Sequence, residues 1–175
     1  MKNTASQLRA ALLAASLAAA GAAQAQSANI DFTTIGTAPT SGTLSNGVNW
    51  SVTAPGTWQH ITSEGQNYYH YSINQGQTQT WTFSQPVDLT FSVAGLNCAN
   101  EAIRFGGGTV SVVSLNAAHT WTAGTQTVSH SSSNVASDGP LQSSFTMGNT
   151  TSLTLTGVNA SCVRGLVSLA VTTVA

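Results

Sequence analysis

Aromatic and imidazole side chains are concentrated between Trp50 and Tyr71 of this 175-residue chain. The stretches Thr57–Thr62 and Tyr68–Ile73 are typical of two strands of a hairpin, joined by the short polar segment between them. Alternate residues of the second strand resemble a core face, so we expect Tyr68 and His70 to point outward.

Rigid aromatic rings with a polar tip suit stacking against sugar rings or packing on another protein. The sequence therefore predicts a binding patch for a glycan or a protein surface. Cross-strand packing of aromatic pairs, at about 0.2–1 kcal/mol for each pair, is the alternative for the same residues. The predicted ligand-binding residues are Trp58, His60, Tyr68, His70 and Trp121. For Trp121, which alternates with His119, we also weigh simple core packing.

The same hairpin permits a sharper hypothesis about a metal ion. A loop centred on Gly65 would set His60 opposite His70, and cross-strand Cβ atoms lie about 4.5–5.5 Å apart. Two imidazoles at that distance can share Zn or Cu, although a site needs further ligands. Only Glu64, His119 or His130 could supply them, so we expect no metal and no other cofactor.

The two cysteines, Cys98 and Cys162, each follow an apolar strand pattern. In an oxidising compartment a pair of this kind is expected to form a disulfide. The chain-entropy model gives a loop of roughly 65 residues a stabilisation of roughly 4 kcal/mol. We therefore predict a structural disulfide between Cys98 and Cys162.

Catalytic signatures are absent from the sequence. There is no G-x-S-x-G elbow, H-E-x-x-H pair, phosphate-binding loop or calcium loop. Only 5% of the residues are charged, which leaves little material for acid–base chemistry. We expect a protein that is not an enzyme, with a secreted hydrolase of unrecognised site as an alternative.

The elements that would position these residues are short strands. Apolar and polar residues alternate along the chain, as in Val87, Leu89, Phe91 and Val93, and again in Val167, Leu169 and Val171. Alternation of this kind predicts antiparallel sheets that are buried on one face only. About eleven short strands are expected, and two sheets that bury their apolar faces together form a β-sandwich of jelly-roll type. The run Trp81–Val93 resembles a strand pair of exported bacterial β-sandwich modules, and Gly106–Gly108 is expected to be a hairpin turn.

The first 25 residues have the pattern of an export signal. Lys2 and Arg9 precede and flank an apolar stretch, Ala10–Ala20, and Ala23–Ala25 is a small-residue cleavage site. The predicted organisation is a signal peptide over residues 1–25 and a single β-sandwich domain over residues 26–175. We expect an exported protein at the cell surface, outside the cell or in the periplasm.

Charge and hydropathy exclude two partner classes. Residues 26–175 keep two arginines, no lysine and five acidic residues. This acidic balance argues against nucleic acid and against adhesion to anionic lipid. The apolar stretch of the leader is about half of the roughly 20 residues that a membrane span needs, so no span is expected.

Three functions remain open. The first is a secreted or cell-surface module that binds or adheres to a glycan or protein through the aromatic hairpin. The second is a structural subunit of an extracellular fibre or biofilm matrix, which would associate with itself, because edge strands without lysine lack a common guard against pairing. The third is a secreted hydrolase.

Overall fold

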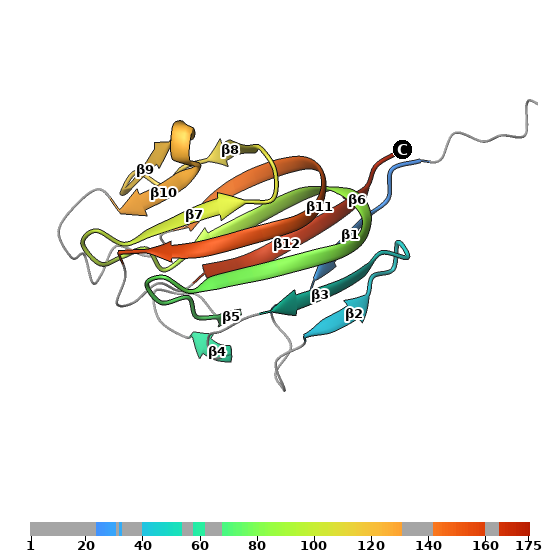
Figure 1. Ribbon diagram of the computed structural model, residues 1–175, viewed down its shortest axis with the longest axis horizontal. Coiled ribbons are helices and arrows are strands. Elements are labelled where there is room, and N and C mark those ends of the chain that lie inside the picture. Colours follow the sequence, from blue (N-terminus) through green and yellow to red (C-terminus); the bar gives the residue numbers. More distant parts are fainter. Residues whose placement is uncertain are drawn as a thin grey trace, which may run out of the picture.

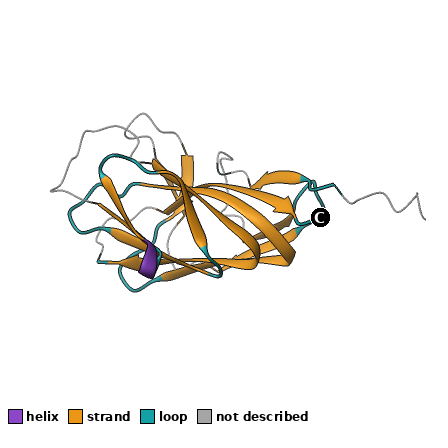
Figure 2. Cartoon of the chain, turned by 90° about the horizontal axis from the view of Figure 1, so that it is seen from above, coloured by secondary structure: helices purple, strands orange, loops and turns teal. Residues whose placement is uncertain are grey.

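The computed structural model describes residues 24–30, 32, 40–53, 58–61, 68–130, 142–159 and 165–175, with only the backbone for 58–61, 68 and 69. The described chain is nearly all strand, with one short 3-10 helix, η1 (Ala123–Thr125) (Figure 2). The strands are β1 (Ser27–Ile30), β2 (Ser41–Thr43), β3 (Asn49–Thr53), β4 (Trp58–Ile61), β5 (Tyr68–Tyr71), β6 (Thr78–Ala94), β7 (Ala102–Gly106), β8 (Val110–Ser114), β9 (His119–Thr122), β10 (Thr127–His130), β11 (Gln142–Val158) and β12 (Gly165–Thr173).

Ten of these strands form one antiparallel sheet, and β4 and β5 form a separate two-stranded sheet. The prediction of an all-β chain is confirmed. The predicted sandwich of two separate large sheets, however, is not confirmed, because β6 and β11 are each 17 residues long and run through both halves of the ten-stranded sheet. Trp81–Val93, which resembles a strand pair, is likewise part of one continuous strand.

The two long strands bend, and the sheet folds over on itself (Figure 1). The first part of β6 pairs with β3, whereas its last part pairs with β12. Similarly, β11 pairs with β8 near its start and with β7 near its end. One half of the sheet therefore has the order β1-β12-β6-β11-β8, which we call the β12 layer, and the other has β2-β3-β6-β11-β7-β10-β9, the β7 layer.

Three glycines, Gly106–Gly108, lie between β7 and β8, which together follow β11 around the bend. Gly106–Gly108 is not a hairpin turn, because β7 and β8 pair with different parts of β11 and not with each other. Gly107 has a φ of 104°, and a Cβ there would collide with the carbonyl oxygen of Ser152. Beside it, β11 carries bulges on both sides of Thr150, whose hydroxyl lies 3.0 Å from the Gly107 carbonyl oxygen. Bulges and left-handed glycines are the ordinary means of bending a sheet.

The core lies between the two layers. Phe91 of the β12 layer contacts Phe105 of the β7 layer with ring centroids 5.3 Å apart, and Phe105 contacts Phe145 at 4.9 Å. The predicted alternation along β6 is confirmed, since Val87, Leu89, Phe91 and Val93 are at most 1% exposed. Burial of apolar surface of this kind is the main term that stabilises such a fold.

The last strand departs from its prediction at one position. Leu169 and Val171 are buried as expected, but Val167 is only half-buried and Leu166 takes its place in the core. The reason is a register shift between Leu166 and Ser168, where β12 meets β6. A bulge of one residue exchanges the faces on which the side chains lie.

Replacement of Leu169 tests the burial of β12. Leu169→Ala should lower the free energy of unfolding by about 2–5 kcal/mol, because it leaves a cavity between the layers. Thr172→Ala, at a half-buried position of the same strand, should change that free energy by no more than about 0.5 kcal/mol. Denaturant unfolding of dilute protein measures both, and equal losses would contradict the position of Leu169 in the core.

Candidate functional site

The aromatic hairpin forms, but its register differs from the prediction. Strands β4 and β5 pair with Trp58 opposite Tyr71, Gln59 opposite His70 and His60 opposite Tyr69. His60 and His70 are therefore not a cross-strand pair, so the facing arrangement on which the metal hypothesis depended is wrong. The centre of the loop lies half a residue away from Gly65, and a shift of this size changes every facing pair.

His70 lies inside the protein, which corrects the prediction that it points outward. Its side chain is 0% exposed, and its neighbours Tyr71 and Ile73 are 5% and 0% exposed. Strand β5 packs close to the start of β12, where Gly165 leaves room: a Cβ there would lie 2.9 Å from the Tyr71 carbonyl oxygen. Because the successive residues His70 and Tyr71 are both buried, both faces of β5 are covered at this point. Burial also raises the pKa of the Tyr71 phenol.

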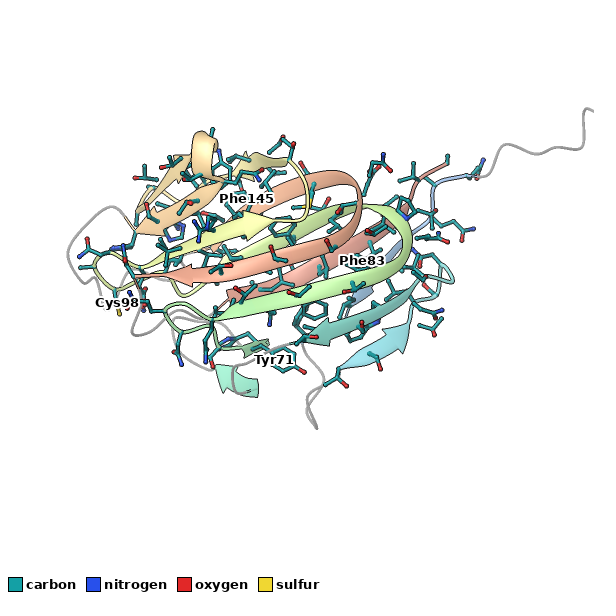
Figure 3. The ribbon with its side chains drawn as sticks, viewed as in Figure 1. Tyr71, Phe83, Cys98 and Phe145 are labelled. Atoms are coloured by element: carbon teal, nitrogen blue, oxygen red, sulfur yellow. The ribbon has the colours of Figure 1, made fainter. Side chains whose placement is uncertain are left out.

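Trp121 belongs to the aromatic core rather than to a binding patch. Trp121 is half-buried, and its ring centroid lies 5.3 Å from that of Phe145, which is labelled in Figure 3, and 6.1 Å from that of Phe105. This is the core packing that the sequence offered as the alternative. The side chains of Trp58, His60 and Tyr68 lie outside the described residues, so a binding role for them stays a prediction.

A buried polar cluster, which sequence reasoning did not identify, lies where β9, β10 and β11 meet. His119, His130 and Ser143 are all buried, and the rings of the two histidines have centroids 6.3 Å apart. His119 Nδ1 lies 2.7 Å from Ser143 Oγ, and His119 Nε2 lies 3.2 Å from the Leu96 carbonyl oxygen. His119 and His130 face each other in the β9–β10 pair, so a predicted register for this hairpin would have placed the two histidines together.

The contacts fix the protonation of His119. A carbonyl oxygen only accepts, so Nε2 must carry the proton and donate to Leu96. The Ser143 hydroxyl then donates to Nδ1, while Ser143 Oγ accepts from the backbone N–H of Asn116 at 3.0 Å. Burial, with a further contribution from His130, lowers the pKa of His119 and keeps its imidazole neutral.

A serine beside a histidine is the pattern of a nucleophile with its base. Here the Ser143 side chain is 0% exposed and all its described contacts lie within the protein. The pair therefore serves to hold strand β9 and the loop after β6 against β11. Among the described residues, no group of three or more His, Cys, Asp or Glu side chains is arranged to hold a metal ion.

Glu101 fastens the loop that carries Cys98. Its Oε2 atom accepts the backbone N–H groups of Asn97 and Cys98, each at 2.7 Å. Its carbonyl oxygen accepts the N–H of His130 at 2.9 Å, which ties this loop to β10. No free cysteine thiol occurs in the described part of the chain. Cys162 lies outside it, so the pairing with Cys98 stays a prediction.

Among the described strands, four have one partner each in the sheet: β1 and β8 in the β12 layer, and β2 and β9 in the β7 layer. None of the four contains a charged residue or a proline. Strand β8 differs from the other three because it exposes apolar side chains on both faces: Val112 is 38% exposed and Val113 is 60% exposed. Leu115, just after the strand, is 38% exposed, so a continuous apolar edge faces solvent.

No known protein family, curated protein or solved structure matches the chain. Within the described residues, no helix is long and apolar enough to cross a membrane. The function must therefore be inferred from the geometry of the described residues.

The neutral state of His119 predicts a dependence of stability on pH. The unfolded histidine has a pKa of about 6.5, whereas the folded pKa is lower. Stability should be complete above pH 6.5 and should fall as the pH drops toward the folded pKa, with a slope of up to about 1.4 kcal/mol per pH unit.

His119→Gln removes the titrating group and keeps a donor for the Leu96 carbonyl oxygen. The variant should be less stable at neutral pH and should show a smaller loss of stability below pH 6.5. Urea unfolding at a series of pH values measures this, and equal slopes for the variant and the original chain would contradict a neutral, buried His119.

Proposed function

We propose that the chain is an exported, non-catalytic structural subunit that associates with other copies of itself through the edges of its sheet. The observation that carries this proposal is the edge strand β8, which pairs with β11 alone among the described strands and exposes Val112 and Val113, with Leu115 just after it. An exposed, apolar edge strand is a template for pairing with a further strand.

The rest of the surface chemistry supports the same proposal. Proteins that stay monomeric guard their edges with lysine, other charges, proline or bulges. Residues 26–175 contain no lysine, and the four edge strands contain none of the other chemical guards. Low charge also removes the long-range repulsion that keeps copies of a soluble protein apart.

Export and a disulfide between Cys98 and Cys162 belong to this proposal. The leader pattern of residues 1–25 would deliver the chain to an oxidising compartment, where the two cysteines would pair. The Cys98 loop is already held by Glu101 through two backbone hydrogen bonds. A disulfide there would add the entropic stabilisation that a subunit outside the cell needs.

Binding of a glycan or another protein through the aromatic hairpin is now proposed for fewer residues than the sequence predicts. His70 is buried and Trp121 packs on Phe145, so these two residues are not part of such a surface. What remains of the patch is Trp58, His60 and Tyr68. Catalysis is not proposed, since the hydroxyl beside His119 is buried.

A charge on β8 tests the proposed function. Residues 26–175 should associate in a concentration-dependent manner in sedimentation velocity, and negative-stain microscopy should show elongated particles. Val113→Lys should weaken association at least tenfold, about 1.4 kcal/mol, because it places an ammonium group on the pairing edge.

Ser51→Lys is the matched control. Ser51 is exposed like Val113, but its strand β3 has neighbours on both sides and is not an edge. Both variants should unfold within about 0.5 kcal/mol of the original chain. A monomer at every concentration, or equal effects of the two lysines, would contradict assembly through β8.

A further inference from the structure

The link between β8 and β9 is held to β11 by one shared hydroxyl group. Ser143 Oγ accepts the backbone N–H of Asn116 at 3.0 Å and lies 2.7 Å from His119 Nδ1. Within the link, Asn116 accepts the N–H of Ala118 through its side-chain oxygen at 2.8 Å and the N–H of His119 through its carbonyl oxygen at 2.9 Å. Because β8 ends at Ser114, just before the link, Ser143 fixes the position of the end of β8.

This arrangement requires a neutral imidazole at His119. With Nε2 donating to the Leu96 carbonyl oxygen, Nδ1 is the acceptor for the Ser143 hydroxyl proton. A protonated His119 has no acceptor nitrogen, so the hydroxyl proton would lose its described acceptor. The positive charge would also be buried, since the His119 side chain is only 5% exposed, and a buried charge is costly.

The titratable groups around His119 favour the neutral form. On β10, the ring of His130 is also buried and its centroid lies 6.3 Å away, so a positive charge on both rings would be unfavourable. On the loop after β6, the Glu101 carboxylate accepts two backbone N–H groups of its own loop. Strand β11 carries no titratable residue. Burial, with a contribution from His130, lowers the pKa of His119.

Strand β9 is placed where a local change can release it. It pairs with β10 alone among the described strands and stands at the end of the sheet order (Figure 1). The helix η1 that follows β9 contains no buried residue, and a Cβ at Gly124 would meet nothing within 4 Å. The segment Leu115–Thr122 can therefore swing about η1, taking Trp121 with it, while β10 keeps its pairing with β7. Marginal elements of this kind are the ones that open locally.

We propose that protonation of His119 releases the segment Leu115–Thr122 from β11 and so weakens assembly through β8 in mildly acidic solution. The release is a property of the fold, whereas its effect on assembly rests on the proposed function. Once Asn116 is free, Leu115 and the end of β8 lose the fixed position that a template for strand pairing needs. Association must then order this end again, at an entropic cost.

Amide hydrogen exchange of residues 26–175, at a concentration where the chain is monomeric, tests the release. Protection of the Asn116, Ala118 and His119 amides should fall up to about tenfold per pH unit below about pH 6.5 and be lost by about pH 5, since the released histidine has a pKa of about 6.5. The amide of Phe91, in the middle of β6, should stay protected. Protection of the link that persists at about pH 5, or an equal loss at Phe91, overturns the release.

Two further measurements attribute the release to His119. In His119→Gln, protection of the link should be the same throughout this pH range, because glutamine gains no proton. His60→Gln is the matched control: it removes a histidine of the separate two-stranded sheet and should behave like the original chain. In the original chain, the His119 ring followed by NMR should titrate below about pH 6.5. A pH-dependent link in His119→Gln, or a ring that titrates at or above that value, overturns the release.

Sedimentation velocity tests the effect on assembly. At the pH where exchange shows the link to be released, the original chain and His60→Gln should associate at least tenfold more weakly than at about pH 7.5, or about 1.4 kcal/mol. His119→Gln should show no such difference.

The remaining outcomes separate the two proposals. If the link is released and association is unchanged, the regulation is overturned and the proposed function stands. If the original chain is a monomer at every concentration and pH, the proposed function and its regulation are both overturned, and the exchange data alone decide the release.

Discussion

The continuity of β6 and β11 is the constraint on which the rest of the structure depends. Each strand is hydrogen-bonded in both layers, so the layers cannot slide or separate without breaking a ladder. The bend must therefore be built with local chemistry: bulges beside Thr150, a left-handed Gly107, and an Asp88 carboxylate that accepts the Asn149 N–H at 2.8 Å. Because the layers share their central strands, their faces are held together and Phe91, Phe105 and Phe145 meet between them.

The bend also determines what is left open. Strands β7 and β8 pair with the same side of β11, one on each side of the bend, and the three glycines Gly106–Gly108 separate them. The part beyond the division, β8, pairs with no second strand among the described residues, and Val112 and Val113 remain at the surface. On the other edge of the same layer, β1 pairs with β12 from Leu169 to Thr172, and the start of β12 at Gly165 lies against β5.

Sequence pattern predicted the parts of this structure that local pleating controls. Alternation identifies the core face of β6 and most of β12, because successive side chains of a strand must point to opposite faces. It could not show that β6 continues through a bend, since a run of exposed residues around Pro86 has the same appearance as a turn. His70 was misplaced because β5 packs against β12, a contact between distant parts of the chain that no local period contains. The pairing of His119 with Ser143 joins residues 24 positions apart, and only the tertiary fold brings them together. The apolar edge of β8 was also missed, since exposure depends on which strand lies beside it.

Residue-resolved amide hydrogen exchange of residues 26–175, at a dilute and a concentrated condition, tests the central claim most directly. The fold and the assembly proposed from it require the amides of β8 to exchange more slowly in the concentrated sample. The amides of the interior strand β3 should exchange at the same rate in both samples, because their partners lie within one copy. Slower exchange at other edges, with β8 unchanged, would contradict the account.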